Sequence, residues 1–371
     1  MLKRIYIDNF RCLVNFELEF DAINLFLGTN GSGKSTVFEV LQKLQALIGG
    51  DKVDGTFKFA DCTRWQTSPI QRFELEILGN EGHYKYELGI NRTWDKCRVE
   101  YERLWFDNQP LLKFELGEVQ LYRDNYSAGP QYQNDWSQSM LPSLLPRNDN
   151  TKLTWFRERI ARFIIVQIIP DLIADESHKE QRHLTPKLEN FISWYRYLSE
   201  DQGKVAEIGN LLKNVLDGFT SFKFERTGSE NSVLYVRFSS SENRNKEISY
   251  RFGELSDGQK TLIALYALIY GTKFEDYTLC IDEPENFLAL PEIQPWLIET
   301  YDLCSEDQLQ TLLISHHPEL INYLLASPIG YWFDRQSNAP VRVKRISNKM
   351  GENSGLPVSE LIARGWLNEP A

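Results

Sequence analysis

The sequence predicts an α/β fold that contains an antiparallel β subdomain and a helical insertion. Three observations carry this prediction. Near the N-terminus, a β-type run ends in a glycine-rich loop that opens a helix. Over residues 72–123 apolar residues alternate with polar ones, which is the period of half-buried strands. In the last third, helical and strand patterns alternate, as in a parallel sheet with crossover helices.

The length of the chain favours more than one structural unit. It has 371 residues, which exceeds the usual size of a single domain. We expect an N-terminal lobe over residues 1–124, a helical insertion over 125–218 and a C-terminal lobe over 219–371. No stretch approaches the roughly 20 apolar residues that span a bilayer, and the N-terminus lacks the apolar core of a secretion signal. These features predict a cytoplasmic protein without a membrane partner.

The elements of the first two lobes follow from local patterns. The runs KRIYI, NFELEF and INLFL predict strands, and STVFEVLQKLQALI has the apolar spacing of a helix. Alternation over residues 72–123, with turn signals between the runs, predicts an antiparallel meander. A polar loop over 125–150 follows. Beyond it we expect helices near Trp155–Ile169, Lys187–Ser199 and Val205–Leu216, and strands over Phe222–Glu225 and Val233–Phe238.

The last third of the chain predicts a doubly wound arrangement. Helices and strands alternate there, and a β pair and a short terminal helix close the chain. The expected helices are Ser256–Tyr270, Pro291–Tyr301 and Pro318–Leu325, the expected strands are Thr278–Ile281 and Thr311–Ile314, and the β pair lies near Tyr331 and Val341–Arg345.

The net charge bears on the choice of partners. It is -11, whereas proteins that grip duplex DNA through a broad face are usually basic. DNA contact would therefore need a local basic patch or a partner subunit. Arg157, Arg159 and Arg162 lie beside Trp155 and Phe156 and offer one candidate patch. Acidic residues nearby favour a solvated helix face over a nucleic-acid surface.

Residues 28–35 read GTNGSGKS and fit the phosphate-binding pattern G-x-x-x-x-G-K-[ST] completely. Glycines let backbone N–H groups turn inward around a phosphate, and the following helix presents its positive end to it. Lys34 would reach the β- and γ-phosphates, and the Ser35 hydroxyl would take one magnesium position. The predicted nucleotide-binding residues of this loop are Asn30, Gly31, Ser32, Gly33, Lys34, Ser35 and Thr36.

An apolar strand further along the chain ends in two adjacent carboxylates, Asp282 and Glu283. Doubly wound sheets place their ligands at the C-terminal ends of buried parallel strands. Asp282 would hold magnesium through water, and Glu283 would polarise or deprotonate the attacking water. An acidic helix cap after a core strand is the alternative interpretation.

The segment LSDGQ precedes a strongly apolar helix and supports two interpretations. Ser256 and Gln259 have the spacing of a capping box. A capped helix start next to Gly258 is also an anion site, here for a γ-phosphate. The local sequence does not choose between them, but the order of motifs does. The glycine loop, this segment, the acidic strand and a histidine-bearing strand end, with His316, follow one another along the chain.

In this order the motifs resemble those of the ABC ATPase superfamily. GTNGSGKST is similar to its Walker A motif, LSDGQ to its signature, LCIDEPEN to its Walker B motif and LISHHPELI to its switch-histidine segment. The opening IDNFRCLVNFELEF, DEPEN and the HxPEL pattern more narrowly resemble the SMC-related, standalone RecF/OLD-like branch of prokaryotic ATPases. The resemblance implies a P-loop NTPase of ABC type, with ATP and Mg²⁺ as cofactors and Glu283, His316 and Lys34 as catalytic residues.

The resemblance also implies a homodimer. Ser256, Gly258 and Gln259 of one protomer would complete the nucleotide site of the other. Arg11, in the NFR segment, would lie near the nucleotide. Gln66 is the predicted lid glutamine and magnesium ligand, with Gln71 as a rival.

Two positions depart from the family pattern. Asp257 replaces the central glycine of the signature. After Glu285 the chain reads NFLALP where relatives usually read NGLHP. The loss of this glycine and histidine is expected to affect communication across the dimer rather than ATP binding.

The leading functional hypothesis is an ATP-driven dimeric switch that controls a partner effector or nuclease subunit, or DNA processing. The resemblance suggests anti-phage defence or DNA repair. A nucleotide-gated scaffold with little turnover is the alternative. A third hypothesis, the nucleotide-binding subunit of a membrane transporter, is disfavoured by the NFR segment and by the long insertion.

Overall fold

The structure is a computed structural model that describes residues 1–228, 231–239, 247–317, 320–322, 329–346 and 355–364. The chain divides into two compact units. Unit 1 contains the described residues of 1–163 and 328–346, and unit 2 contains those of 164–327 and 347–367.

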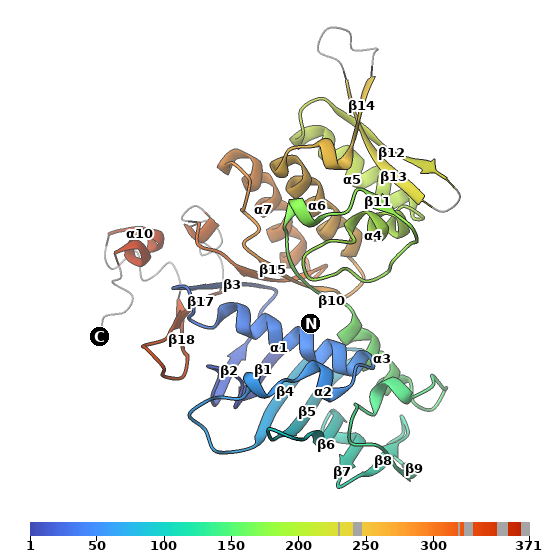
Figure 1. The fold of residues 1–371 in the computed structure, drawn as a ribbon, viewed down its shortest axis with the longest axis vertical. Coiled ribbons are helices and arrows are strands. Elements are labelled where there is room, and N and C mark those ends of the chain that lie inside the picture. Colours follow the sequence, from blue (N-terminus) through green and yellow to red (C-terminus); the bar gives the residue numbers. More distant parts are fainter. Residues whose placement is uncertain (229–230, 240–246, 318–319, 323–328, 347–354, 365–371) are drawn as a thin grey trace. The chain divides into compact units, whose positions relative to one another are not determined.

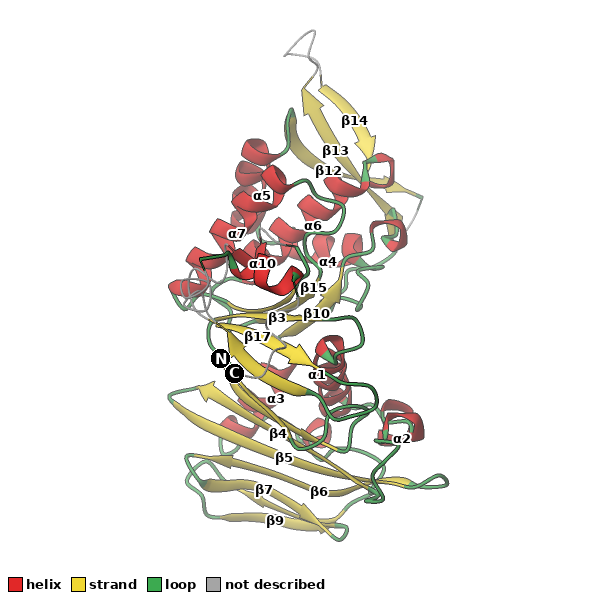
Figure 2. Cartoon of the chain, turned by 90° about the vertical axis from the view of Figure 1, so that its left-hand side faces the viewer, coloured by secondary structure: helices red, strands yellow, loops and turns green. Residues whose placement is uncertain are grey.

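The larger sheet of unit 1 has eight strands, in the order β2-β1-β4-β5-β6-β7-β8-β9. All neighbouring strands pair antiparallel, and the successive strands of the meander lie side by side in Figure 2. The strands are β1 (Leu2–Asp8), β2 (Phe16–Glu19), β4 (Ile70–Gly79), β5 (Gly82–Arg92), β6 (Cys97–Phe106), β7 (Gln109–Glu115), β8 (Glu118–Tyr122) and β9 (Ala128–Gln133). The predicted antiparallel meander is therefore confirmed.

Alternation along these strands gives the sheet one buried face. Helix α3 (Thr151–Ala161) packs on that face. Its Trp155 ring stacks on Tyr84 with 4.9 Å between centroids, and Phe156 lies 5.4 Å from the Tyr86 ring. Aromatic contacts of this kind add to the burial of apolar area.

A second group of strands in unit 1 supports the glycine-rich loop. β3 (Ile23–Gly28) is buried along its whole length, as expected for a central parallel strand. It pairs parallel with β17 (Ile329–Asp334), which pairs antiparallel with β18 (Arg342–Ile346). Phe26 of β3 contacts Phe38 of helix α1 (Lys34–Gly49) and Phe333 of β17. The short helix α2 (Val53–Thr56) follows α1.

The core of unit 2 combines parallel strands with two long helices. Strand β15 (Thr278–Asp282) pairs parallel with β16 (Gln310–Ile314) and is flanked on its other side by β10 (Phe163–Gln167). Helix α6 (Asp257–Thr272) is buried all round over its last three turns, so it is a core helix. The Trp296 indole of α7 (Leu290–Ser305) donates a 3.1 Å hydrogen bond to the Leu265 carbonyl of α6.

Unit 2 also contains a smaller antiparallel sheet (Figure 1). Strand β13 (Asn231–Ser239) pairs with β12 (Phe219–Thr227) on one side, and with β11 (Glu176–Ser177) and β14 (Glu247–Arg251) on the other. Tyr195 of α4 (Phe191–Leu198) packs on Phe222 of β12. Among the described residues, unit 2 also contains helices α5 (Gln202–Val215) and α10 (Val358–Ala363). Single turns of 3-10 helix occur in the chain at Phe59–Asp61, Leu141–Ser143, Pro170–Leu172 and Phe252–Glu254.

The prediction of one helix near Trp155–Ile169 is wrong for the second half of that range. Helix α3 ends at Ala161, and the run FIIVQ forms strand β10. Short runs of β-branched residues favour strands, but periodicity alone does not separate them from a buried helix. Strands β9 and β14 were not expected either. The helix expected over Pro318–Leu325 lies mostly outside the described residues.

Helix α3, which carries Arg157 and Arg159, forms neither the candidate nucleic-acid patch nor the solvated face that the sequence analysis considered for these arginines. Arg159 is fully buried, and its guanidinium lies 5.1 Å from the centroid of the Phe163 ring. Arg157 donates a 2.8 Å hydrogen bond to the Leu144 carbonyl. Neither arginine is therefore part of a freely solvated helix face.

Across the described portion of the chain, no helix combines the length and the apolar character needed to cross a membrane.

Candidate nucleotide-binding site

The glycine-rich loop of unit 1 runs from the end of β3 to the start of α1. Gly28 has φ 145°, and a Cβ there would lie 2.3 Å from the Phe333 carbonyl oxygen. Gly33 has φ 102°, and a Cβ there would lie 2.8 Å from Val341. Both the backbone conformation and the close neighbours exclude larger side chains at these two positions. Residues of β17 and of the β17–β18 loop, far away in sequence, therefore shape the phosphate loop.

Lys34 is the first residue of α1 and is only 5% exposed. Its ammonium donates hydrogen bonds to the Gly28 and Thr29 carbonyl oxygens, at 2.8 and 3.0 Å. No side chain caps α1, whose N-cap is Gly33. The start of a helix attracts anions through its unsatisfied N–H groups and its dipole. The loop thus combines an anion-binding helix start with a positioned lysine.

The remaining predicted loop residues lie around this helix start. Asn30, Gly31 and Ser35 are exposed, Thr36 is partly buried, and Ser32 is buried. A hydroxyl at position 35 offers the hard oxygen donor that Mg²⁺ prefers, as do the carboxylate of Asp282 and the amide oxygen of Gln66. The donor chemistry of the three predicted metal ligands therefore fits magnesium.

Arg335, which contacts the loop, and Trp65, which lies beside Arg335, were not identified from the sequence. The Arg335 guanidinium lies 3.4 Å from the Gly31 carbonyl oxygen, to which it donates, and 5.9 Å from the centroid of the Trp65 ring. Trp65 is 42% exposed, which is unusual for a large aromatic residue. Trp65 could have been noticed as the neighbour of Gln66. Nothing in the sequence connects Arg335 with a loop about 300 positions earlier.

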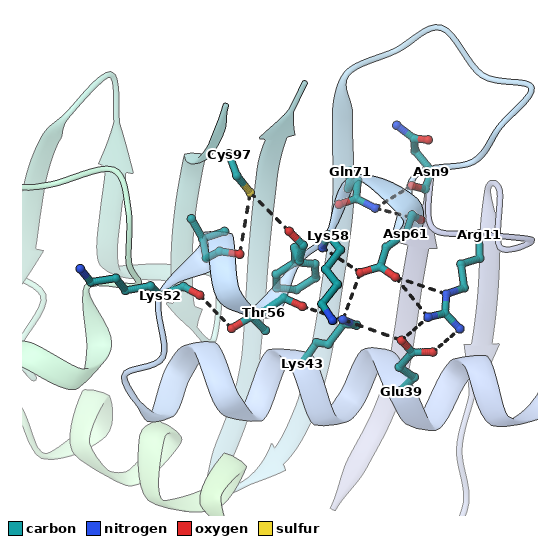
Figure 3. A network of polar contacts seen from close by, with 12 residues as sticks. Asn9, Arg11, Glu39, Lys43, Lys52, Thr56, Lys58, Asp61, Gln71 and Cys97 are labelled. Atoms are coloured by element: carbon teal, nitrogen blue, oxygen red, sulfur yellow. Dashed lines mark hydrogen bonds and ion pairs between the residues drawn. The ribbon is translucent and has the colours of Figure 1, made fainter. Parts of the chain in front are cut away.

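Arg11 lies in a network of charged groups (Figure 3). Its guanidinium contacts the Glu39 carboxylate at 2.6 Å and the Asp61 carboxylate at 3.2 Å. The Lys43 ammonium lies 3.0 Å from the other Asp61 oxygen. The neighbouring Cys12 sulfur lies 3.1 Å from the position of a Cβ at Gly33. Arg11 is thus anchored near the phosphate loop, and its contact with a nucleotide stays a prediction.

The two carboxylates of this network have pKa values shifted in opposite directions. Burial tends to raise the pKa of Asp61, but hydrogen bonds from the Lys58 N–H, Lys43 and Arg11 outweigh it and lower the pKa below its usual value. Burial raises the pKa of Glu39, and attraction to Arg11 and Lys43 does not offset it. Asp61 is therefore the carboxylate that the network holds in its ionised form.

The two candidate lid glutamines have different surroundings. Gln71 is fully buried, and its amide donates to the Asn9 carbonyl at 2.9 Å and to the Asp61 carbonyl at 3.3 Å. Gln66 is partly buried, with a 3.5 Å contact to the Asp8 carboxylate. The Gln71 side chain is therefore engaged in hydrogen bonds that stabilise the fold, and Gln66 remains the predicted lid residue.

The acidic pair lies at the end of β15 in unit 2. The β15–β16 ladder pairs Asp282 with Ile314, and the next N–H, that of Glu283, donates to the Ile314 carbonyl at 2.9 Å. Glu283 has φ 53°. For a residue other than glycine such a conformation costs on the order of 1 kcal/mol and occurs often at functional sites. The amide of Asn286 donates to the Glu283 carboxylate at 2.8 Å and orients it.

A second carboxylate, Glu285, fixes the end of the neighbouring strand. It accepts hydrogen bonds from the Ser315 hydroxyl at 2.6 Å and from the His316 N–H at 3.2 Å. The Ser315 hydroxyl also accepts a 3.0 Å bond from the His317 N–H. His316 itself is exposed. Sequence reasoning assigned no role to Glu285, although its place in DEPEN was a visible signal.

The predicted capping box is present at the start of α6. The Ser256 hydroxyl accepts from the Gln259 N–H at 3.3 Å, and the Gln259 side chain accepts from the Ser256 N–H at 3.1 Å. A Cβ at Gly258 would lie 2.9 Å from the Phe287 carbonyl oxygen. Phe287 belongs to the segment that departs from the family pattern; it has φ 70° and is 54% exposed. The altered segment thus touches the start of the signature helix.

The predicted site residues fall into two sets, one in each unit. Unit 1 carries the phosphate loop, Arg11 and Gln66, whereas unit 2 carries Ser256, Gly258, Gln259, Asp282, Glu283 and His316. The phosphate loop, Asp282, Glu283 and the Ser256 segment lie at the end of a strand or at the start of a helix, which are the usual positions for ligand contacts in α/β folds, whereas Arg11 and Gln66 lie in loops.

Known proteins support this interpretation of the fold. The family described as "AAA domain, putative AbiEii toxin, Type IV TA system" matches residues 23–322. No curated protein matches the sequence. A crystal structure of the "SmcHead bound to the C-winged helix domain of ScpA" is similar, with 12% identity, a TM-score of 0.56 and coverage of 94% of this chain and 99% of that one. The "SMC head domain from Thermotoga maritima" has 13% identity, a TM-score of 0.51 and coverage of 93% and 99%.

These likenesses show that the chain has the P-loop NTPase fold of an ABC-type SMC head. The family match extends over most of the sequence. The chain therefore belongs to the family of AAA domains described as putative AbiEii toxins of type IV toxin–antitoxin systems.

Proposed function

We propose that this chain binds ATP with Mg²⁺ at the phosphate loop, hydrolyses it, and works as a dimeric switch. The observation that carries the proposal is the loop itself. Gly28 and Gly33 are sterically required, and Lys34 is held at the start of an uncapped helix. Family membership supports a nucleotide-binding ATPase.

In this proposal each side chain has a separate task. Lys34 would neutralise the β- and γ-phosphates. Ser35, Asp282 and Gln66 would hold Mg²⁺, which offsets the charge that develops on the phosphates. Glu283, oriented by Asn286, would accept the proton of the attacking water. His316 would donate a hydrogen bond to the γ-phosphate. Arg11 would lie beside the bound nucleotide.

Trp65 and Arg335 would hold the base. An indole ring and a guanidinium both offer flat surfaces for stacking; Arg335 contacts the phosphate loop at Gly31, and Trp65 lies beside Arg335. The exposure of Trp65 supports this role, because a base would cover it.

A second protomer would complete the site. Ser256, Gly258 and Gln259 would contact the γ-phosphate held by the partner, using the N–H groups at the start of α6. Phe287, exposed beside Gly258, would lie at the same junction. Closure on ATP and reopening after hydrolysis would then change what a partner effector, nuclease or DNA can do.

The test compares two variants of the 371-residue chain. For Glu283→Gln we expect retained ATP binding, loss of turnover and an ATP-dependent closed dimer. For Lys34→Ala we expect loss of ATP binding itself. The control is Glu292→Gln, because Glu292 accepts from the Ala289 N–H at the start of α7 and lies outside the proposed site. Unchanged turnover in Glu283→Gln would show that Glu283 does not accept the proton of the attacking water. Intact ATP binding in Lys34→Ala would show that the phosphate loop is not the ATP site.

We further propose a role in anti-phage defence or DNA repair, through a partner effector or nuclease subunit. The RecF/OLD-like motifs support it, as does the description of the family as putative toxins. A solved SMC head carries a bound winged-helix domain, which supports the idea that such heads carry partners. The alternative is a nucleotide-gated scaffold. Negligible ATPase activity with and without DNA and partner, combined with ATP-dependent assembly, would favour the scaffold.

A further inference from the structure

Strand β14 is an open edge of the small sheet in unit 2 (Figure 1). Within the described part of the chain it pairs only with β13, without any shift in register, and all five of its residues are exposed. Proteins usually blunt such edges with proline, lysine or bulges. The opposite edge, β12, carries Lys223 and a register shift, and the unit 1 edge strand β9 carries Pro130 and a register shift. Strand β14 has no proline, lysine or register shift, and its two charged residues, Glu247 and Arg251, lie at its ends.

The backbone of β14 presents its free hydrogen-bonding groups at defined positions. On β13, the Ser239 N–H donates at 2.8 Å to the carbonyl of Gly218, which precedes β12. Backbone groups alternate in direction along a strand, so those of Phe238 face β14 and bond with Ile248, its partner in the register. The N–H and C=O of Ser249 therefore point away from the sheet.

The same alternation applies to both ends of the strand. The Arg251 N–H donates at 2.6 Å to the Glu254 carboxylate instead of to β13, as expected for a group that faces outward. The backbone of Glu247 has the same orientation by alternation. The odd-numbered residues of β14 thus form the open edge, and a partner strand would bond to them.

The sequence of β14, Glu-Ile-Ser-Tyr-Arg, is complementary to itself in the antiparallel direction. If Ser249 faces Ser249 of a second copy, Glu247 of each chain faces Arg251 of the other. Ile248 then faces Tyr250 of the other chain. Opposite charges, and aromatic residues opposite β-branched ones, are favourable cross-strand pairs. In this register the odd-numbered residues of one strand face those of the other, so their outward-facing backbone groups can bond with each other.

Within the described residues, the apolar face of the sheet continues onto β14, where its side chains are exposed. The Tyr250 ring lies 5.9 Å from Phe238, which lies 6.3 Å from Phe219. Ile248 and Tyr250 are 40% and 42% exposed. A second copy paired in the register above would set its own Ile248 and Tyr250 against them and continue this aromatic row.

We propose that two copies of the chain join through β14, in a two-fold antiparallel pair centred on Ser249. A two-fold axis makes the same patch self-complementary, which is the commonest arrangement of homodimers. This contact needs no nucleotide and is separate from the ATP-dependent dimer proposed above.

Charge reversal tests the pairing. Each experiment uses the full chain in the Lys34→Ala background without nucleotide, so that an ATP-dependent dimer does not contribute. We expect the mass of two chains by sedimentation for this parent. Glu247→Arg and Arg251→Glu should each weaken association at least about tenfold, since like charges then face each other. The double variant Glu247→Arg with Arg251→Glu should restore association. A monomeric parent, or a double variant as weak as the single ones, would overturn the proposal.

Cross-linking tests the register. Facing residues in a hydrogen-bonded pair have Cα atoms about 5.5 Å apart, within the range that a disulfide bridges. Ser249→Cys should therefore form a covalent dimer on mild oxidation, visible on a non-reducing gel. Thr227→Cys, also exposed but at the end of β12, should not. Equal cross-linking of the two variants, or none for Ser249→Cys, would contradict the register.

Discussion

The carboxylate of Glu285 accepts a 2.6 Å hydrogen bond from the hydroxyl of Ser315. Ser315 is fully buried at the end of β16, and Glu285 follows β15. The same carboxylate oxygen accepts from the His316 N–H. The Glu285 carboxylate therefore links the acidic segment both to Ser315 and to the backbone of the predicted switch histidine, His316.

Replacing Glu285 by alanine should lower the free energy of unfolding of the chain by about 2–4 kcal/mol. Hydrogen bonds to a charged acceptor are worth about 1.5–3 kcal/mol, and the buried Ser315 hydroxyl would lose its acceptor. Glu285→Gln keeps one acceptor oxygen and should cost less than half as much. Urea denaturation measures both. Equal stability of the two variants would show that the hydrogen bond contributes little.

Alanine at Gly258 should destabilise the chain although alanine favours helices. The new Cβ would lie 2.9 Å from the Phe287 carbonyl oxygen, so the start of α6 or the Phe287 segment must move. We expect a cost of about 1–2 kcal/mol. Gly209 in α5 is the matched control, because a Cβ there meets nothing within 4 Å. Gly209→Ala should stabilise by about 0.5–1 kcal/mol. A Gly258→Ala variant as stable as Gly209→Ala would contradict the close contact.

The contribution of Asp61 to stability should depend on pH. Its pKa in the folded chain lies below its ordinary value, and the unfolded value is about 3.9. The stabilisation is therefore present above pH 4 and is lost as the pH falls through the folded pKa. Asp61→Asn should cost about 2 kcal/mol at neutral pH, because Lys43 and Arg11 lose a charged acceptor. The measurement is thermal or urea unfolding of both proteins between pH 7 and about 3. A difference that stays constant over this range would exclude ionisation of Asp61 as its source.

Removing the Trp65 ring should weaken ATP binding if it stacks on the base. Loss of one base–aromatic stacking contact is worth about 1–3 kcal/mol, so we expect roughly a tenfold increase in Kd. Arg335→Ala should have a similar effect, through the same surface. Trp94→Ala is the control, since Trp94 is 81% exposed on the β5–β6 turn. Calorimetric titration with a non-hydrolysable ATP analogue measures all three. Equal affinities for Trp65→Ala and Trp94→Ala would place the base elsewhere.

Periodicity and turn residues predicted most of the secondary structure, because these signals are local. The meander after residue 70, the helix after the phosphate loop and the strand before Asp282 are confirmed. The prediction failed at Phe163–Gln167, where a short apolar run suits a helix and a strand equally. It also missed β14, whose exposed residues show no buried face.

The sequence by itself determined the phosphate loop, the capping box at Ser256 and the order of the motifs, because each depends on residues close together along the chain. Only the tertiary structure decided that β17 and the segment before β18 press against Gly28 and Gly33. It likewise decided that Arg335 lies beside Trp65 and that Glu285 holds Ser315. These contacts join residues that are distant in sequence, and their geometry follows from packing, which no local pattern encodes.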